Sequence, residues 1–367
     1  MQTYTIYKDE DYYLEVAKQV AATKSGDRIA IITMTFWPEE QLIRPIFEEL
    51  IKAAKRGVRI DLAIDAFAFM MTQKDEPIGP LFFNLDPAKT KLPRRFYLKM
   101  KALNEFSKAG GHYYILNKPT HWPTNPTSGR SHIKATVIND EVYVGGCNFG
   151  DSNQIDYMVR IRNAETTEWI YEMIHRIAKN GNSRRALDST DLSLNPDTDT
   201  EILVDSGVKR QSLILDTALD FIDQSQKWLV ITCQYYPGGM TADHIDSAHK
   251  RGVKVYPIYN NTNKFGAVES LVHSMILERE RLRHSKALFN GQLPRSHKRL
   301  HAKLIATENG AMIGSHNYVD MLVRRGTAEI AILRHDPDFA IEAVSILLRQ
   351  LKVNDGSRFS KPDLANL

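Results

Sequence analysis

The sequence predicts an α/β protein made of two duplicated domains. Three observations support this prediction: a strand–helix–strand pattern occurs twice, a His-x-Lys motif with the same downstream spacing occurs twice, and a polar stretch separates the two copies. With 367 residues, the chain is long for one hydrophobic core and sufficient for two.

The first strand–helix–strand pattern lies near the N-terminus. RIAIITMTFWP (28–38) is an apolar, β-branched run that predicts a buried strand. The helical pattern PIFEELIKAAKRGV follows, and its basic residues before Gly57 are a normal helix stop. A second strand, RIDLAIDAF, comes next, and the amphipathic stretch DYYLEVAKQVAAT predicts a helix ahead of the whole unit.

The second copy repeats this order. WLVITCQYYP (228–237) predicts a strand, TADHIDSAHKRGV (241–253) a helix, and VKVYPIYN the next strand, with SLILDTALDFIDQ as the preceding helix. The helix stops AAKRGVRI and SAHKRGVKV are nearly superimposable. Strand–helix–strand order of this kind predicts mostly parallel strand pairing within each domain.

The stretch between the copies, 180–201, reads NGNSRRALDSTDLSLNPDTDTE and is polar, poor in aromatic residues and rich in turn formers. Such composition is typical of a connection between domains. We therefore predict a first domain at 1–182, a polar linker at 183–200 and a second domain at 201–367.

The overall composition is that of an ordinary folded protein, with 43% hydrophobic and 25% charged residues. The net charge of +4 is compatible with anionic partners but does not distinguish nucleic acid from lipid. Two cysteines provide no disulfide framework, which favours a reducing compartment. The N-terminus resembles no secretory signal, and the apolar runs are shorter than the ~20 residues of a membrane-spanning helix. We expect a cytoplasmic protein that lies on a membrane surface if its substrate is lipid.

The strongest signal is a motif that occurs once in each half, within SHIKATVINDEVYVGGCNFGD and LHAKLIATENGAMIGSHNYVD. In both copies a lysine follows the histidine by two residues and an asparagine follows it by sixteen, with turns expected at Asn139–Asp140 and Asn309–Gly310. The motif residues are His132, Lys134, Gly145, Gly146, Cys147 and Asn148 in the first copy and His301, Lys303, Gly314, Ser315, His316 and Asn317 in the second. Packing alone does not explain such equal spacing.

The geometry of a strand explains why histidine and lysine are two residues apart. Side chains at i and i+2 project from the same face, so the imidazole and the ammonium point into one cleft. The returning strand brings Gly-x-x-Asn beside them, and its small residues leave room for a ligand. Two such clusters facing each other would surround a phosphodiester with two histidines, two lysines and two asparagines.

The doubled motif resembles the HxKxxxxD motif of the phospholipase D superfamily, each copy being followed by the family's Gly-(Gly/Ser)-x-Asn. DYMVRI (156–161) and CQYYPGG (233–239) resemble elements of bacterial cardiolipin synthases, which are the most similar subgroup. The eighth motif position departs from the pattern, with Asn139 and Glu308 in place of Asp, an acid thought to be structural. The resemblance implies two phospholipase D-like α/β/α sandwich domains, related by a pseudo-twofold axis and sharing one active site.

The resemblance also implies roles for the motif residues. His132 is the expected nucleophile, which forms a phosphohistidine, and His301 the general acid and base, although the sequence leaves an exchange of these roles open. Asp156 and Glu329, each on the strand after its motif, are candidates to orient an imidazole. The residues expected to hold the equatorial phosphate oxygens are Lys134, Lys303, Asn148 and Asn317, and those expected to bind substrate are Gly146, Ser315 and His316. This chemistry requires neither a metal nor another cofactor.

The acceptor of the phosphoryl group decides the reaction. Water gives a phospholipase D hydrolase, whereas a second phosphatidylglycerol gives cardiolipin. Lipid is favoured by the apolar stretch AFAFMM…PLFF (66–83) and the basic, aromatic KTKLPRRFYLKMK after it, which suit an anionic bilayer surface.

We predict a cardiolipin synthase-like phosphatidyltransferase at the inner face of the membrane, acting on an anionic phospholipid without an obligate protein partner. The alternatives are a nuclease or other nucleic-acid phosphodiesterase of the same superfamily, and a non-catalytic lipid-binding descendant.

Overall fold

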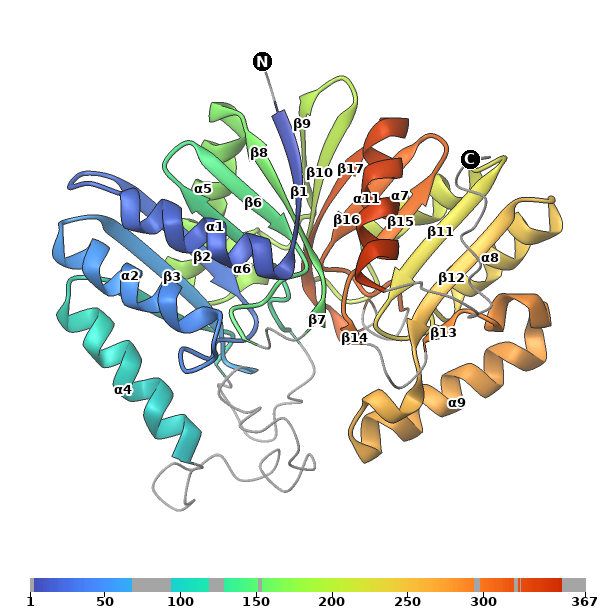
Figure 1. Ribbon diagram of the computed structural model, residues 1–367, viewed down its shortest axis with the longest axis horizontal. Coiled ribbons are helices and arrows are strands. Elements are labelled where there is room, and N and C mark those ends of the chain that lie inside the picture. The colour runs from blue at the N-terminus through green and yellow to red at the C-terminus, as the bar shows by residue number, and fades with distance from the viewer. Residues whose placement is uncertain are drawn as a thin grey trace.

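The computed structural model describes residues 3–67, 94–118, 129–150, 154–293, 298–319, 323 and 325–351. Two large β-sheets, one from each half of the chain, lie beside each other with helices around them (Figure 1). The first sheet has seven strands in the order β1-β8-β6-β5-β2-β3-β4, and the second has eight in the order β13-β12-β11-β15-β16-β17-β10-β9. A third, two-stranded sheet joins β14 to β7.

The first half supplies the elements up to helix α6. They are β1 (Thr3–Lys8), α1 (Asp9–Ala22), β2 (Arg28–Thr33), α2 (Ile43–Lys55), β3 (Arg59–Asp65), α4 (Arg94–Lys108), β4 (His112–Leu116), β5 (Ala135–Ile138), β6 (Glu141–Gly145), β7 (Gln154–Ile155), β8 (Tyr157–Arg162), α5 (Ala164–Asn180) and α6 (Ser183–Ala186).

The second half supplies the remaining elements. They are β9 (Leu192–Asp197), β10 (Thr200–Ser206), α7 (Leu213–Asp223), β11 (Trp228–Cys233), α8 (Met240–Lys250), β12 (Lys254–Asn260), η2 (Thr262–Lys264), α9 (Ala267–Arg283), η3 (Lys286–Phe289), β13 (Gln292–Leu293), β14 (Arg299–Leu300), β15 (Leu304–Thr307), β16 (Gly310–Gly314), β17 (Ala328–Arg334) and α11 (Pro337–Gln350).

The two sheets have the same strand order once the extra edge strand β9 is set aside. β1, β8, β6, β5, β2, β3 and β4 of the first sheet correspond to β10, β17, β16, β15, β11, β12 and β13 of the second. The predicted strand–helix–strand units are confirmed as β2-α2-β3 and β11-α8-β12. Both helices are followed by a glycine with positive φ, Gly57 at 87° and Gly252 at 95°, as the repeated stop predicts. The chain is therefore a structural duplication.

The prediction of mostly parallel pairing is wrong. Among the described strands of the two large sheets, only β2–β3 and β3–β4, and in the second half β11–β12 and β12–β13, are parallel. The motif strands β5–β6 and β15–β16 are hairpins, which can only be antiparallel, and the strands after them continue that arrangement. Within each large sheet, parallel pairing is thus confined to strands joined through a helix, and the separate pair β7–β14 links the two halves in parallel.

One hydrophobic core lies between the two sheets and draws on both halves. It includes Val159 of β8 and Ile174 of α5 together with Val204 of β10, Ile332 of β17 and Val344 of α11. Separate cores lie under the outer helices, one beneath α1, α2 and α4 and the other beneath α7, α8 and α9. Each sheet is consequently covered on both faces, and each domain is an α/β/α sandwich.

The segment predicted to be a linker, 183–200, is structured. It contains helix α6 and strand β9, which pairs antiparallel with β10 at the edge of the second sheet. Leu192 and Leu194 of β9 pack against the shared core, while Ser193 between them is exposed. An edge strand with one solvated face has a polar composition, and this explains why the segment resembled a connection.

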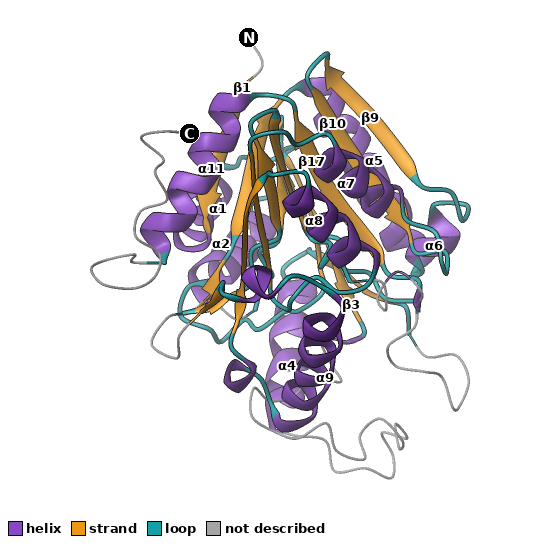
Figure 2. Cartoon of the chain, turned by 90° about the vertical axis from the view of Figure 1, so that its right-hand side faces the viewer, coloured by secondary structure: helices purple, strands orange, loops and turns teal. Residues whose placement is uncertain are grey.

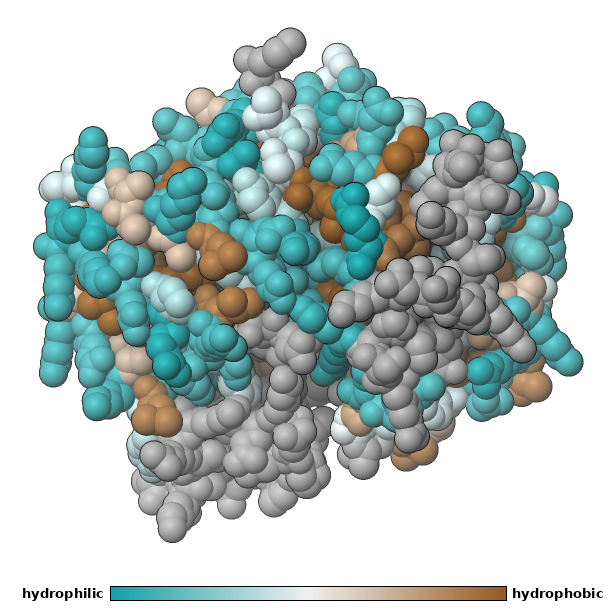
Figure 3. Space-filling view, viewed as in Figure 1, coloured by the Kyte–Doolittle hydropathy of each residue, from teal (hydrophilic) through white to brown (hydrophobic). Residues whose placement is uncertain are grey.

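Helices α4 and α9 extend from the same end of the molecule in both ribbon views (Figures 1 and 2). Figure 3 shows that the face carrying α1 and α11 is mainly hydrophilic, with hydrophobic residues in small separate groups. Within the described ranges, no helix is long and apolar enough to cross a bilayer.

Candidate active site

The two motif histidines lie where the halves meet. The backbone N–H of His132 donates to the carbonyl oxygen of Ala328 at 2.7 Å, and that of His301 donates to the carbonyl oxygen of Ile155 at 2.9 Å. Ile155 immediately precedes Asp156, and Ala328 precedes Glu329. Each histidine is therefore held beside the acidic residue of the opposite half.

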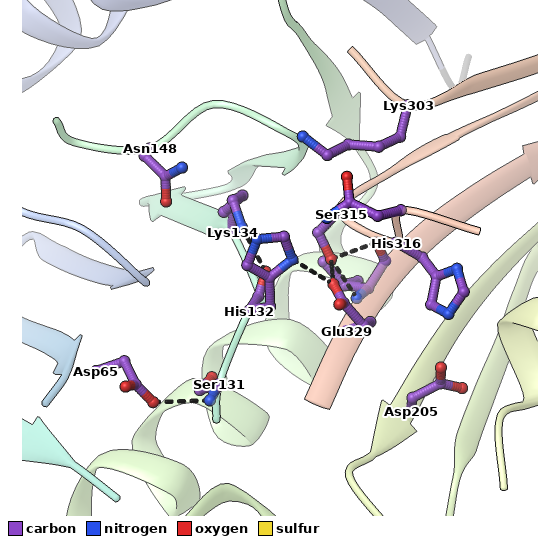
Figure 4. Close-up of polar contacts among 12 residues, drawn as sticks. Asp65, Ser131, His132, Lys134, Asn148, Asp205, Lys303, Ser315, His316 and Glu329 are labelled. Atoms are coloured by element: carbon purple, nitrogen blue, oxygen red, sulfur yellow. Dashed lines mark hydrogen bonds and ion pairs between the residues drawn. The ribbon is translucent and has the colours of Figure 1, made fainter. Parts of the chain in front are cut away.

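The side chains continue this exchange. Nδ1 of His132 lies 2.7 Å from Oε2 of Glu329, and Nδ1 of His301 lies 2.5 Å from Oδ2 of Asp156 (Figure 4 shows the first pair). A carboxylate on Nδ1 orients the ring and leaves Nε2 for substrate. We call these two contacts the crossed pairs. Each motif histidine thus takes its carboxylate partner from the other half of the chain.

The two motif lysines are buried beside the imidazoles. Nζ of Lys134 donates to the carbonyl oxygen of His132 at 2.7 Å. Nζ of Lys303 donates to the carbonyl oxygen of His301 and lies 2.8 Å from its Nδ1. Both lysines are 1% exposed, so their charges are held in the interior, where an anion would offset them.

Burial and the lysines together determine the protonation of the imidazoles. Burial, with Lys134 and Lys303 nearby, holds the pKa of His132 well below its usual range. Burial and Lys303 lower the pKa of His301 to about 3, although Asp156 opposes this shift. Burial also lowers the pKa of Lys134 to about 7. Both imidazoles are therefore neutral at physiological pH.

The two carboxyl groups differ in their electrostatics. Burial alone would raise the pKa of Asp156, but Lys303 and His301 lower it below its ordinary value. Burial raises the pKa of Glu329, although His316 and Lys134 oppose this shift. Asp156 is thus more readily ionised than Glu329. Because an ionised carboxylate stabilises an imidazolium, Asp156 favours protonation of His301 more than Glu329 favours protonation of His132.

Gly146 and Ser315 occupy the same motif position, and both lie against the acidic residue of their own half. A Cβ atom on Gly146 would lie 2.1 Å from Oδ1 of Asp156, so that only glycine leaves room for the carboxylate. Ser315 is fully buried, and its Oγ donates to Oε2 of Glu329 at 2.5 Å and accepts from the backbone N–H of Ile330 at 3.0 Å. The sequence predicted substrate contacts for both residues, whereas their contacts in the structure are with the two carboxyl groups.

His316, the third predicted substrate-binding residue, is 2% exposed. Its Nδ1 accepts from the backbone N–H of Tyr318 at 3.0 Å, and burial lowers its pKa to about 4. Figure 4 shows its ring on the side of Glu329 away from His132. His316 therefore packs behind a crossed pair as a neutral ring.

The motif asparagines lie next to the ends of β2 and β11. Oδ1 of Asn148 accepts from the backbone N–H of Thr35 at 3.4 Å. The carbonyl oxygen of Asn317 accepts from Sγ of Cys233 at 2.8 Å. In both halves the motif asparagine is thus joined to the end of the first strand of the strand–helix–strand unit, β2 or β11, although through different atoms.

The eighth motif position has a structural role in both copies, as the resemblance implies. Oδ1 of Asn139 accepts from the backbone N–H of Arg28 at 3.2 Å, and Oε2 of Glu308 accepts from that of Trp228 at 3.3 Å. Each side chain therefore ties the motif hairpin to the start of the neighbouring strand. The second turn is formed by Glu308 and Asn309, because Thr307 pairs with Gly310, and the expectation of a turn at Asn309–Gly310 is wrong by one residue.

Sequence reasoning missed a matched pair of residues at the ends of β3 and β12. Oδ2 of Asp65 accepts from the backbone N–H of Ser131 at 2.7 Å (Figure 4). Asn260 donates from Nδ2 to the carbonyl oxygen of Leu300 at 2.7 Å and accepts from its N–H at 2.8 Å. Both side chains hold the residue immediately before a motif histidine. Alignment of RIDLAID with KVYPIYN would have shown a polar residue ending both strands.

Comparison with known proteins agrees with this architecture. The family model described as "Cardiolipin synthase, PLD-like domain" matches residues 19–178 and 218–350. A crystal structure of phosphatidylserine synthase from Haemophilus influenzae Rd KW20 is similar, with a TM-score of 0.68 and 14% identity over 95% of this chain and 86% of that one. Polyphosphate kinase from Porphyromonas gingivalis has a TM-score of 0.56 and 12% identity over 96% of this chain and 50% of that one.

Sequence comparison with curated proteins found no match. The two structural likenesses, at such low identity, establish the fold alone. The family model covers most of both halves, each of which contains one copy of the motif. The chain therefore belongs to the family of phospholipase D-like domains that is described by the name of cardiolipin synthase.

Proposed function

We propose that the protein is a phospholipase D-type phosphatidyltransferase that acts through a phosphohistidine, cardiolipin synthase-like in its use of phosphatidylglycerol. The observation that carries this proposal is the crossed pairs: two imidazoles, each backed by a carboxylate from the other half and flanked by a buried lysine. This arrangement provides a nucleophile, an acid and two cations around one phosphorus atom.

In the first step, Nε2 of His132 attacks the phosphorus of the donor in line with the bond to the leaving alcohol. The N–P bond forms as the P–O bond breaks, and His301, protonated, gives its proton to the leaving oxygen. Lys134 and Lys303, helped by Asn148 and Asn317, hold the non-bridging oxygens. The products are phosphatidyl-His132 and the free alcohol.

The electrostatics support this division of roles. Asp156 has a lowered pKa and a short contact to His301, so it stabilises an imidazolium, whereas Glu329 has a raised pKa and supports His132 less in that form. A nucleophile must be neutral, and an acid must be protonated. Because an anionic phosphodiester offsets the charge of Lys303, we expect the pKa of His301 to rise when substrate binds.

In the second step, the acceptor alcohol attacks phosphorus from the side of His301. His301, now neutral, takes the proton of the hydroxyl as the new P–O bond forms and the N–P bond breaks. With phosphatidylglycerol as donor and acceptor, the products are glycerol from the first step and cardiolipin from the second. With water as the acceptor, the product is phosphatidic acid.

We place the reaction at the inner face of the membrane, with anionic phospholipid as the partner. The support is the end of the molecule from which α4 and α9 extend (Figure 1), because both helices carry exposed large apolar side chains. These residues are Tyr97, Leu98, Leu271, Val272, Met275 and Leu282. Apolar side chains of this kind suit the boundary region of a bilayer. Most of the stretch 66–83, which also predicted lipid contact, lies outside the described residues.

The test is turnover on phosphatidylglycerol vesicles, with released glycerol measured enzymatically and lipid products identified by mass spectrometry. We expect glycerol and cardiolipin in equal amounts, and neither from His132→Gln or His301→Gln. Phosphatidic acid in place of cardiolipin would make the protein a hydrolase. Cleavage of single-stranded DNA or RNA that disappears in His132→Gln, without turnover of any anionic phospholipid, would replace this proposal with the nuclease alternative.

A further inference from the structure

An arginine precedes each motif histidine by two residues. Arg130 stands in RSHIK and Arg299 in RLHAK, so the doubled motif is in fact Arg-x-His-x-Lys. Each guanidinium lies over an aromatic ring, that of Arg130 at 5.5 Å from the ring centre of Phe67 and that of Arg299 at 5.0 Å from that of Phe265. The two arginines are therefore duplicated in placement as well as in sequence.

The two halves differ in the residue that accompanies the arginine. In the first half, Oδ1 of Asp65 lies 3.4 Å from Nη1 of Arg130, and both side chains are buried. The matched position in the second half is Asn260, an amide that bonds the backbone of Leu300. The acid that accompanies the arginine in the first half is thus matched by a neutral amide in the second half, where the arginine lies two residues before His301.

Aromatic packing fixes the position of Arg299. The ring of Phe265 stacks on that of Tyr235 with centres 5.0 Å apart, and His273 lies edge-on to Phe265 at 5.2 Å. The hydroxyl of Tyr235 accepts from Nε2 of Gln234 at 2.7 Å. We call Tyr235, Phe265 and Arg299 the platform. Tyr235 comes two residues after Cys233, the last residue of β11, whose Sγ contacts the motif residue Asn317.

We propose that Arg299 binds an anionic group of the acceptor alcohol, namely the phosphate that the acceptor itself carries. This inference rests on the proposed function and names its acceptor class. Because attack by His132 places the leaving and incoming alcohols on the side of His301, the acceptor hydroxyl must lie beside His301. Arg299 is two residues away along an extended segment, about 7 Å, which is comparable to the length of a glycerol head group.

A guanidinium suits this role because it stays charged and binds phosphate oxygens through two parallel hydrogen bonds. Water and neutral alcohols have no anionic group and gain nothing from it. The platform would therefore select a phosphate-bearing alcohol over water, as a transferase requires.

The experiment compares two soluble acceptors with one donor, a phosphatidyl ester of p-nitrophenol. The aryl leaving group reports the first step, and mass spectrometry measures transfer to glycerol phosphate against glycerol at equal subsaturating concentrations. We expect wild-type protein to prefer glycerol phosphate and Arg299→Gln to lower that ratio at least tenfold, the loss expected for charged hydrogen bonds. Arg299→Lys should lie between the two.

Two further variants make the result specific. Asn260→Asp places the acid of the first half beside Arg299 and should also lower the ratio. Lys298→Gln removes a neighbouring exposed cation that pairs with Glu10 at 2.7 Å and should leave the ratio unchanged. An unchanged ratio in Arg299→Gln would overturn the inference while leaving the proposed function intact. Wild-type transfer to water alone would overturn the inference and would make the protein a hydrolase. Absence of p-nitrophenol release by wild-type protein would overturn both proposals.

Discussion

The first half places glycine beside its carboxyl group, whereas the second half places serine beside its own. Asp156 is short and approaches Gly146 so closely that no side chain fits between them. Glu329 is longer by one methylene, and the hydroxyl of Ser315 holds its Oε2 at 2.5 Å. The same fold thus brings two different acids to the same place relative to an imidazole.

In this duplicated chain, the features that the two halves share and the residues in which they differ have separate consequences. The shared strand order sets the geometry, because it places each histidine against the acid of the opposite half. Differences at the matched positions set the chemistry, because Asp156 has a lowered pKa and Glu329 a raised one. In the proposed mechanism, the symmetry of the fold brings two imidazoles to one phosphate, and the difference between the two acids makes His132 the nucleophile and His301 the acid.

The largest effect is expected from exchanging either histidine for glutamine. Both His132→Gln and His301→Gln should lower turnover of phosphatidylglycerol by at least ~10³-fold, since each removes an essential group. An aryl leaving group needs no proton, so His301→Gln should still release one equivalent of p-nitrophenol, and His132→Gln none. Rapid-mixing absorbance and the mass of the intact protein measure this. A burst in His132→Gln but not in His301→Gln would show that His301 is the nucleophile and His132 the acid.

The next largest effect is expected at the acids of the crossed pairs. Asp156→Asn and Glu329→Gln should each cost ~10²–10⁴-fold in kcat, because an amide no longer stabilises the imidazole in its working form. With the aryl donor, the rate of the p-nitrophenol burst should fall less in Asp156→Asn than in Glu329→Gln, because that donor needs no acid in the first step but still needs the nucleophile. Rapid-mixing absorbance tests this, and the reverse order would contradict the crossed assignment.

Exchanging the small residues between the halves sharpens the comparison. Gly146→Ser forces the carboxylate of Asp156 away from His301, and we expect a loss approaching that of Asp156→Asn, about 10²-fold. Ser315→Gly removes one hydrogen bond to Glu329 and should lower stability by about 1 kcal/mol with a smaller effect on kcat. Urea unfolding and kinetics report the two effects separately. Equal losses of activity in both variants would show that the halves respond alike.

The smallest effect is expected from pH. Lys134, with a pKa of about 7, is charged below that pH and loses its proton above it. Because the charged form attracts the phosphate, kcat/KM should fall about tenfold between pH 7 and pH 8.5. Lys134→Arg should remove this fall, because arginine stays protonated. A wild-type profile that is flat from pH 6 to pH 9 would contradict the assignment.

The features visible in the sequence were those set by local spacing. The units β2-α2-β3 and β11-α8-β12 were predicted from hydrophobic periodicity and the repeated helix stop. The His-x-Lys spacing identified the residues that lie together where the two halves meet. Such signals persist because a strand or a helix stop depends on a few neighbouring residues.

The features that could not be predicted depend on contacts between distant residues. His132 and Glu329 are 197 residues apart in the chain, and His301 and Asp156 are 145 apart, so no local pattern shows that the pairs cross. The glycine at 146 is explained only by the approach of Asp156, and strand β9 only by its pairing with β10. Tertiary packing determines each of these.

The central claim is that His132 and His301 act on opposite sides of a single phosphorus atom. A crystal structure with orthovanadate, which mimics the five-coordinate phosphorus of the transfer, tests it most directly. We predict one vanadate per chain, bonded to Nε2 of His132, with its far apical oxygen hydrogen-bonded to Nε2 of His301 and its equatorial oxygens on Lys134 and Lys303. Two vanadates in separate sites, or one that contacts a single histidine, would contradict the account.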